Sequence, residues 1–91
     1  MPGIHTTDTA RDIALHALGW TLAEPDRADR LLATTGLTPT DLRERIEHPQ
    51  MLAAVLGFLL AHEPDLIACA AALGERPEAL VAAHDLLDAA A

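Results

Sequence analysis

Five prolines divide most of this chain into segments of helical length. They are Pro25, Pro39, Pro49, Pro64 and Pro77, and each lies 10 to 15 residues from the next. Proline fits the first turn of a helix, where its missing N–H would have no partner, but inside a helix it removes a hydrogen bond and clashes with the preceding turn. The residue before a proline is also displaced from the helical backbone region. Each proline therefore predicts the end of one helix and the start of the next.

The prolines and the apolar pattern together predict six helices. Their expected ranges are 8–23, 25–35, 39–47, 49–62, 64–73 and 77–89. No segment alternates between apolar and polar residues as a half-buried strand would. The range 49–62 is apolar almost all round, which is typical of a helix covered by its neighbours. We therefore expect an all-α fold, a compact bundle of five to six short helices, most starting at an X-Pro step, with the apolar helix 49–62 central.

Composition agrees with one small helical domain. The 91 residues are 51% hydrophobic, and most of these are Ala and Leu, which lose little side-chain entropy in a helix. A chain of this length forms one domain with a thin core. We expect residues 1–6 to form a flexible N-terminal tail and residues 7–89 to form the single helical domain.

The connection between the second and third expected helices carries the clearest local signal. Gly36 suits the left-handed residue that ends a helix. Thr38 and Asp41 have the spacing of a capping box, in which each side chain binds the backbone N–H of the other. Gly74 and Pro77 repeat this glycine-to-proline spacing before the last helix.

Charge and composition argue against nucleic acid and membrane as partners. The formal net charge is −8, and all 6 basic residues are Arg, so the surface repels phosphate backbones and anionic lipids. The longest apolar run, residues 51–61, is too short to cross a bilayer, and the first residues lack the regions of a signal peptide. The single cysteine, Cys69, forms no intramolecular disulfide, and its apolar neighbours predict burial. We expect a cytoplasmic protein.

No pattern predicts chemistry. The chain has no serine and no glycine-rich loop for a phosphate. Its five histidines show none of the i, i+4 spacing that places two metal ligands on one helical face. His48 and Glu63 each precede a proline and are predicted to be N-cap residues. We therefore expect no enzyme activity, with no catalytic, cofactor-binding or metal-binding residues and no cofactor.

A partial helix-turn-helix pattern supports the alternative of a small DNA-binding regulator. Ala70, Gly74 and Leu80 have the spacing of a small residue, a turn glycine and a later apolar residue. The helix that would enter the major groove carries no basic residue near its start to meet phosphate or guanine. The net charge of −8 also disfavours this alternative.

Trp20 and Arg43 are the candidate partner contacts. Trp20 ends the first expected helix, where it either fills the edge of the core or anchors an interface. Arg43 lies on the short third helix, where it either forms an ion pair with Glu47 or Glu63, or meets an anion or a partner.

Two blocks of sequence resemble a known family. The first block contains Leu31-Leu32 and Thr35-Gly36-Leu37-Thr38-Pro39-Thr40-Asp41-Leu42-Arg43; the second contains Pro49-Gln50-Met51-Leu52, Val55-Leu56-Gly57-Phe58-Leu59-Leu60 and Glu63. On these residues the chain resembles a family of short bacterial proteins, mainly alphaproteobacterial, that is catalogued only as a domain of unknown function. The resemblance covers about residues 13–87 and implies a small helical protein of this length. It implies no activity, cofactor or site residue.

Elimination leaves a binding role as the favoured function. No motif assigns a function directly, and nothing in the pattern predicts catalysis. We therefore expect a non-catalytic protein–protein interaction or regulatory module, with a protein partner or self-association as its binding mode. The high apolar content for so short a chain is compatible with either mode.

Overall fold

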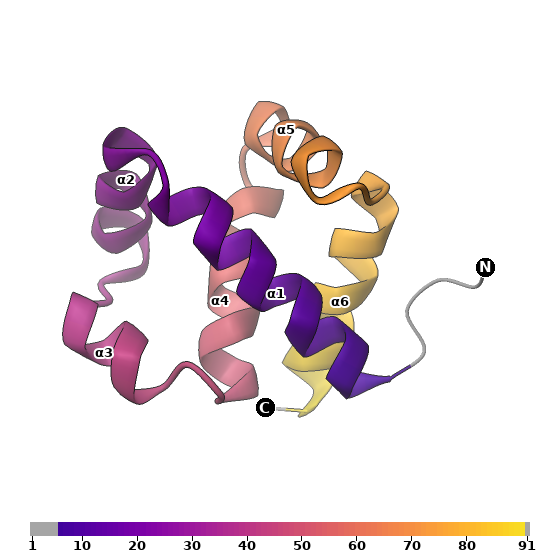
Figure 1. Ribbon diagram of the computed structural model, residues 1–91. Helices are drawn as coiled ribbons and strands as arrows, with labels where there is room; N and C mark the ends of the chain where they lie inside the picture. Colours follow the sequence, from indigo (N-terminus) through magenta and orange to yellow (C-terminus); the bar gives the residue numbers. More distant parts are fainter. Residues whose placement is uncertain (1–5, 91) are drawn as a thin grey trace.

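Six helices follow one another along residues 6–90, the part of the chain that the computed structural model describes (Figure 1). They are α1 (Thr7–Leu22), α2 (Pro25–Thr35), α3 (Pro39–Glu44), α4 (Pro49–Leu60), α5 (Glu63–Leu73) and α6 (Pro77–Ala90). Residues 6–90 contain no strand, so the expected all-α fold is confirmed. The radius of gyration is 11.9 Å, close to the ~12 Å of a compact chain of this length.

The prolines lie where the sequence pattern predicts them. Pro25, Pro39, Pro49 and Pro77 are the first residues of their helices, and Pro64 is the second residue of α5. All five therefore occupy the first turn, where the missing N–H removes no helical hydrogen bond. The expected ranges agree with the observed helices to within two residues, except at the end of α3.

The third helix ends three residues earlier than predicted, and a turn connects it to Pro49. α3 ends at Glu44, and its C-cap residue Arg45 has φ −113° and ψ 18°. The N–H of His48 then donates to the carbonyl of Arg45 at 2.9 Å, which closes a turn. His48 itself is extended, with φ −79° and ψ 126°, as a residue before proline should be.

One of the two N-cap predictions is confirmed and the other is wrong. His48 is the N-cap of α4, but Glu63 is the first residue of α5, whose N-cap is the extended His62. The helix can begin before Pro64 because the second helical position also has no partner for its N–H. Neither histidine makes a side-chain capping bond.

The two glycine caps and the capping box are present as predicted. Gly36 ends α2 with φ 75° and Gly74 ends α5 with φ 70°, a conformation that costs glycine little. The hydroxyl of Thr38 accepts the N–H of Asp41, and the carboxylate of Asp41 accepts the N–H of Thr38, both at 3.0 Å. Pro39 therefore begins α3 inside a complete capping box.

Helix α4 lies at the centre of the bundle, as its apolar composition predicts. It packs against α1, α2, α5 and α6, and α1 crosses in front of it (Figure 1). Seven of its 12 residues are buried: Met51, Leu52, Ala53, Val55, Leu56, Phe58 and Leu59. α1 is a second centre, since it also contacts α2, α5 and α6.

Helices α2 and α3 form an arm at the side of this core. Each of them buries a single residue, Leu31 in α2 and Leu42 in α3. The main contacts of α2 are with α1 and α4. Few side chains of the arm therefore pack into the core, and much of its apolar surface lies outside the core.

Two expectations concern the start of the chain and a membrane. The predicted tail of residues 1–6 lies outside the described residues except for Thr6, the N-cap of α1, whose hydroxyl accepts the N–H of Thr9. Within residues 6–90, no single helix combines the length and the apolar character needed to cross a membrane. α4 and α5 reach that length and composition only as a pair bent by 114°.

Truncation of the central helix should destabilise the whole domain. Leu56 is fully buried in α4, whereas Ile67 on α5 is 52% exposed. We expect Leu56→Ala to lower the free energy of unfolding by about 2–5 kcal/mol, through lost apolar burial and the cavity left behind. The matched change Ile67→Ala should alter it by about 0.5 kcal/mol or less. Urea unfolding followed by circular dichroism measures both, and equal losses would contradict the central position of α4.

Candidate functional site

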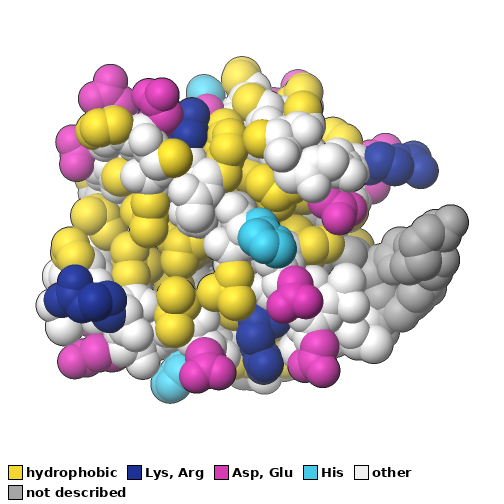
Figure 2. Space-filling view, viewed as in Figure 1, with side chains coloured by type: hydrophobic (Ala, Val, Ile, Leu, Met, Phe, Trp, Pro, Cys, Tyr) yellow, Lys and Arg dark blue, Asp and Glu magenta, His cyan; other side chains and the backbone are white. Residues whose placement is uncertain are grey.

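An apolar groove lies where the arm meets α1. It encloses about 350 Å³ and is lined by Leu18, Leu22, Ala28, Leu32, Pro39, Leu42, Arg43 and Ile46. In Figure 2 hydrophobic side chains gather between α2 and α3 beside α1, with charged side chains of both signs at the edges. We call this feature the apolar groove.

The groove follows from helical spacing on three segments. α1 and α2 each contribute a pair of residues at i and i+4, and the α3 segment contributes residues at i, i+3, i+4 and i+7. Residues at these spacings share one face of a helix. Because the arm is held away from full contact with α1, the three apolar faces form a groove instead of a closed core.

The rims of the groove are unusually exposed for large apolar side chains. Leu22 at the end of α1 is 42% exposed, and Ile46 after α3 is 40% exposed. Both lie close to an X-Pro break, where the helix stops and its neighbours no longer cover it. Adjacent exposed apolar groups around a hollow are typical of a binding surface.

Arg43 brings the only polar side chain to the groove lining. It is exposed, and its guanidinium donates to the hydroxyl of Thr40 at 3.2 Å. The helical i, i+4 pair expected with Glu47 does not form, because α3 ends at Glu44. A guanidinium stays charged and cannot accept a proton at neutral pH. The groove therefore offers apolar contact and one cation, and its lining holds no acid or base for catalysis.

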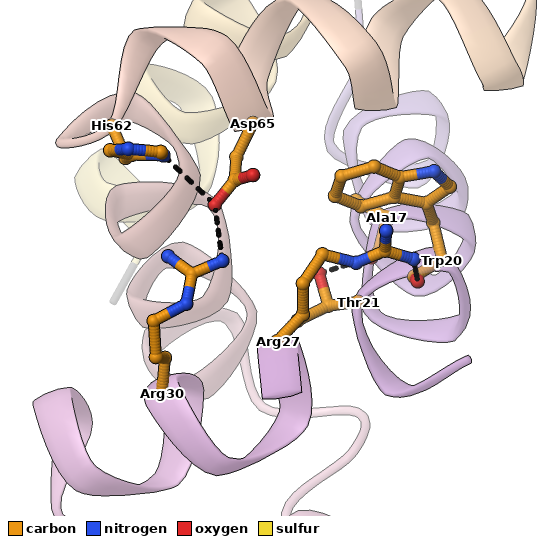
Figure 3. A network of polar contacts seen from close by, with 7 residues as sticks. All are labelled: Ala17, Trp20, Thr21, Arg27, Arg30, His62 and Asp65. Atoms are coloured by element: carbon orange, nitrogen blue, oxygen red, sulfur yellow. Dashed lines mark hydrogen bonds and ion pairs between the residues drawn. The ribbon is translucent and has the colours of Figure 1, made fainter. Parts of the chain in front are cut away.

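Trp20, the other predicted partner contact, lies outside the groove. It is partly buried and packs against the core. The guanidinium carbon of Arg27 lies 3.6 Å from the centroid of its ring, and Arg27 also donates to the carbonyl oxygen of Trp20 (Figure 3). This stacking joins the start of α2 to the end of α1. Trp20 thus helps to hold one wall of the groove in place.

A second polar contact holds the other side of α2. Asp65 on α5 accepts from Arg30 of α2 and lies against His62, with both nitrogen–oxygen distances 3.0 Å (Figure 3). Burial alone would raise the pKa of Asp65, but the hydrogen bonds from Arg30 and His62 outweigh it and hold the pKa below the ordinary value of 3.8. The Arg30 guanidinium also lies 5.7 Å from the ring centroid of Phe58 on α4. The wall formed by α2 is therefore tied to α1, α4 and α5.

Two further hollows have more polar linings. One lies between α1 and the end of α5, and the other lies beside the start of α4. Their volumes are about 340 and 420 Å³, and their linings are Ile13, His16, Ala72, Leu73 and Glu75, and Leu37, Arg45, His48, Gln50, Met51 and Ala54. Both expose more polar surface than the apolar groove and have no exposed large apolar residue at the rim.

The other residues singled out in the sequence take structural positions. Cys69 is fully buried, and burial raises its pKa to about 11, so the thiol stays protonated at neutral pH. Within residues 6–90, His, Cys, Asp and Glu side chains do not come together in groups of three or more that could hold a metal ion.

The residues of the partial helix-turn-helix pattern lie at the turn between α5 and α6. Ala70 and Leu80 are buried, and the N–H of Glu75 donates to the carbonyl of Ala70 at 2.8 Å across Gly74. This bond is the one that closes a Schellman motif. The first turn of α6 carries Glu78 and no basic residue.

The sequence did not single out the lining residues other than Arg43. Leu18, Leu22, Leu32 and Ile46 carry the pattern of core-facing residues, and nothing local separates them from residues that are fully buried. The one usable signal is position: Leu22 and Ile46 come within three residues of Pro25 and Pro49. At such ends a helix has few neighbours to cover it.

The fold and the groove define a small all-α domain of six helices with an open apolar surface. The chain belongs to the family described as "Protein of unknown function (DUF3572)", whose profile matches residues 7–90. The match spans all six helices and therefore every residue of the groove. The family membership inferred from the two sequence blocks is confirmed. Neither the curated proteins nor the solved structures give a match to this chain.

The ion pair of Asp65 should make stability depend on pH in the acid range. Because the folded pKa of Asp65 is lowered, its contribution is present above the ordinary value of 3.8 and is lost as the pH falls through the folded pKa. We expect Asp65→Asn to be less stable than the wild type at neutral pH, and the difference to shrink below pH 3.8. Urea unfolding at several pH values measures this. A difference that stays constant down to pH 2 would contradict it.

The stacking of Arg27 on the single tryptophan can be followed by fluorescence. We expect Arg27→Ala to increase the quenching of Trp20 by acrylamide and to cost about 0.5–1 kcal/mol of stability, since the guanidinium covers the ring face. Arg43→Ala is the matched control, because Arg43 lies in the groove and Trp20 does not. Equal quenching in the wild type and Arg27→Ala would show that the ring is not covered.

Proposed function

We propose that this chain is a non-catalytic protein-binding module, and that a segment of a partner protein docks in the apolar groove. The observation that carries the proposal is the pair of half-exposed rims, Leu22 and Ile46, around an almost wholly apolar lining. Covering such surface on association removes it from water, which is the main driving force of protein binding. The proposal includes no cofactor. The cytoplasmic location remains a prediction from the sequence.

The distribution of arginines supports a protein partner over DNA, the alternative function. A DNA-binding face would need its cations together and free to meet phosphate. Arg27 is stacked on Trp20, and Arg30 is paired with Asp65. Arg43 and Arg45 line two different hollows. The arginines thus serve contacts within the domain or lie apart.

Substitutions at the rims test the proposal. We expect Leu22→Asp and Ile46→Asp to abolish capture of a partner from a native lysate, because a charge in the groove would be buried on binding. Ile67→Asp is the matched control, since Ile67 is also exposed but lies on α5, outside the groove lining. Circular dichroism checks that all three variants remain folded. Mass spectrometry identifies proteins that the wild type and the control retain and both groove variants lose.

Two outcomes would contradict the proposal. In the first, all the variants capture the same proteins as the wild type. In the second, the wild type captures nothing and remains a monomer in solution at all concentrations measured. A dimer of the wild type that both groove variants disrupt would instead assign the groove to self-association.

A further inference from the structure

The lining of the groove restricts the backbone of whatever occupies it. Seven of the eight lining residues have apolar side chains, and the eighth, Arg43, is only a donor. An extended peptide would bury backbone N–H and C=O groups with almost no partner, and each would cost free energy. The described residues also have no sheet edge to which an extended strand could add. A helix avoids this cost, because it satisfies its own backbone hydrogen bonds.

Exposed apolar residues on two different segments favour a helix over a single acyl chain. Leu22 is the last residue of α1 and Ile46 follows α3, and each side chain is about two-fifths exposed. One acyl chain in the floor of the groove would leave much of both rims in water. A helix is roughly 10 Å across with its side chains, so it can contact both rims and the floor together.

One wall of the groove carries a cation. Arg43, on the α3 side, is exposed and lines the groove. The charged residues of α2 alternate in sign, and none of them lines the groove. A complementary helix therefore places an acidic residue beside its apolar stripe, opposite Arg43.

A second folded copy of this chain does not offer such a helix. Within residues 6–90, the large apolar residues that are clearly exposed are Leu22, Ile46, Ile67 and Val81. Each lies on a different helix or turn, so no helix presents two of them one turn apart. The occupant is better supplied by another protein.

From these observations we infer that the groove binds an amphipathic helix of a partner protein. Its apolar anchors lie at i, i+3 or i+4, and i+7, and an acidic residue faces Arg43. This inference rests on the proposed function and names the kind of partner that the site takes.

A synthetic helix tests the inference by a double-mutant cycle. The probe is a fluorescent peptide of about 16 residues, rich in Ala, with leucines at i, i+3, i+7 and i+10, Glu along one edge and Lys along the other. A second peptide has Gln in place of every Glu, and a third has Ala in place of two leucines. Fluorescence anisotropy measures the affinity of each for the wild type, Arg43→Gln and the control Arg76→Gln. Arg76 lies just before α6 and outside the groove lining.

We expect the Glu peptide to bind the wild type about two- to fivefold more tightly than the Gln peptide. Arg43→Gln should remove that difference, and Arg76→Gln should keep it. Loss of two leucines should weaken binding about tenfold or more. An equal affinity of the Glu and Gln peptides, or a difference that persists in Arg43→Gln, would overturn the assigned charge contact.

The remaining outcomes separate this inference from the proposed function. If no peptide binds but the groove variants lose a natural partner, the proposed function stands and the helical occupant is wrong. If dodecanoate binds the groove and no peptide does, the site belongs to acyl chains and the inference is overturned. If no peptide binds and no partner depends on the groove, both proposals fail.

Discussion

The burial of α4 is the interaction on which the rest of the structure depends. An apolar helix in water must be covered on every side, and α1, α2, α5 and α6 supply that cover. The cover includes the buried residues Leu80, Ala83 and Leu87 of α6, whereas α5 buries only Cys69 and Ala70. The short α3 takes little part, so the arm of α2 and α3 keeps apolar surface outside the core. The apolar groove lies where this arm, which buries one residue per helix, meets α1.

Polar contacts then decide how the arm is held. α2 buries only Leu31, which by itself gives little control over its position. Arg27 on Trp20 and Arg30 on Asp65 fix the helix at two points on different neighbours. These contacts engage two of the 6 arginines of an acidic chain. α2 is thereby fixed beside α1 and α5, and Arg43 lies exposed on the lining of the groove.

Sequence patterns predicted the fold well where local chemistry decides the backbone. Prolines, the glycine caps and the Thr38 capping box set where helices begin and end, because each acts within one turn. The errors are also local. Glu63 was expected to precede α5, because a proline fits either the first or the second position of a helix and the sequence does not show which one Pro64 occupies. α3 was expected to continue to residue 47, because the residues of the turn before Pro49 are not typical turn residues. Of the two predicted partner contacts, Arg43 lies in the groove and Trp20 supports its wall.

The sequence by itself determined the all-α fold, most of the helix ends, the central position of α4 and the family to which the chain belongs. Only the tertiary structure decided which leucines are fully covered and which stay exposed along the groove, and which arginines are engaged within the domain. The reason is physical. Backbone conformation at a helix end is governed by neighbours in sequence. The exposure of an apolar side chain depends instead on how closely a helix far along the chain approaches it. The periodicity of one helix does not encode that distance.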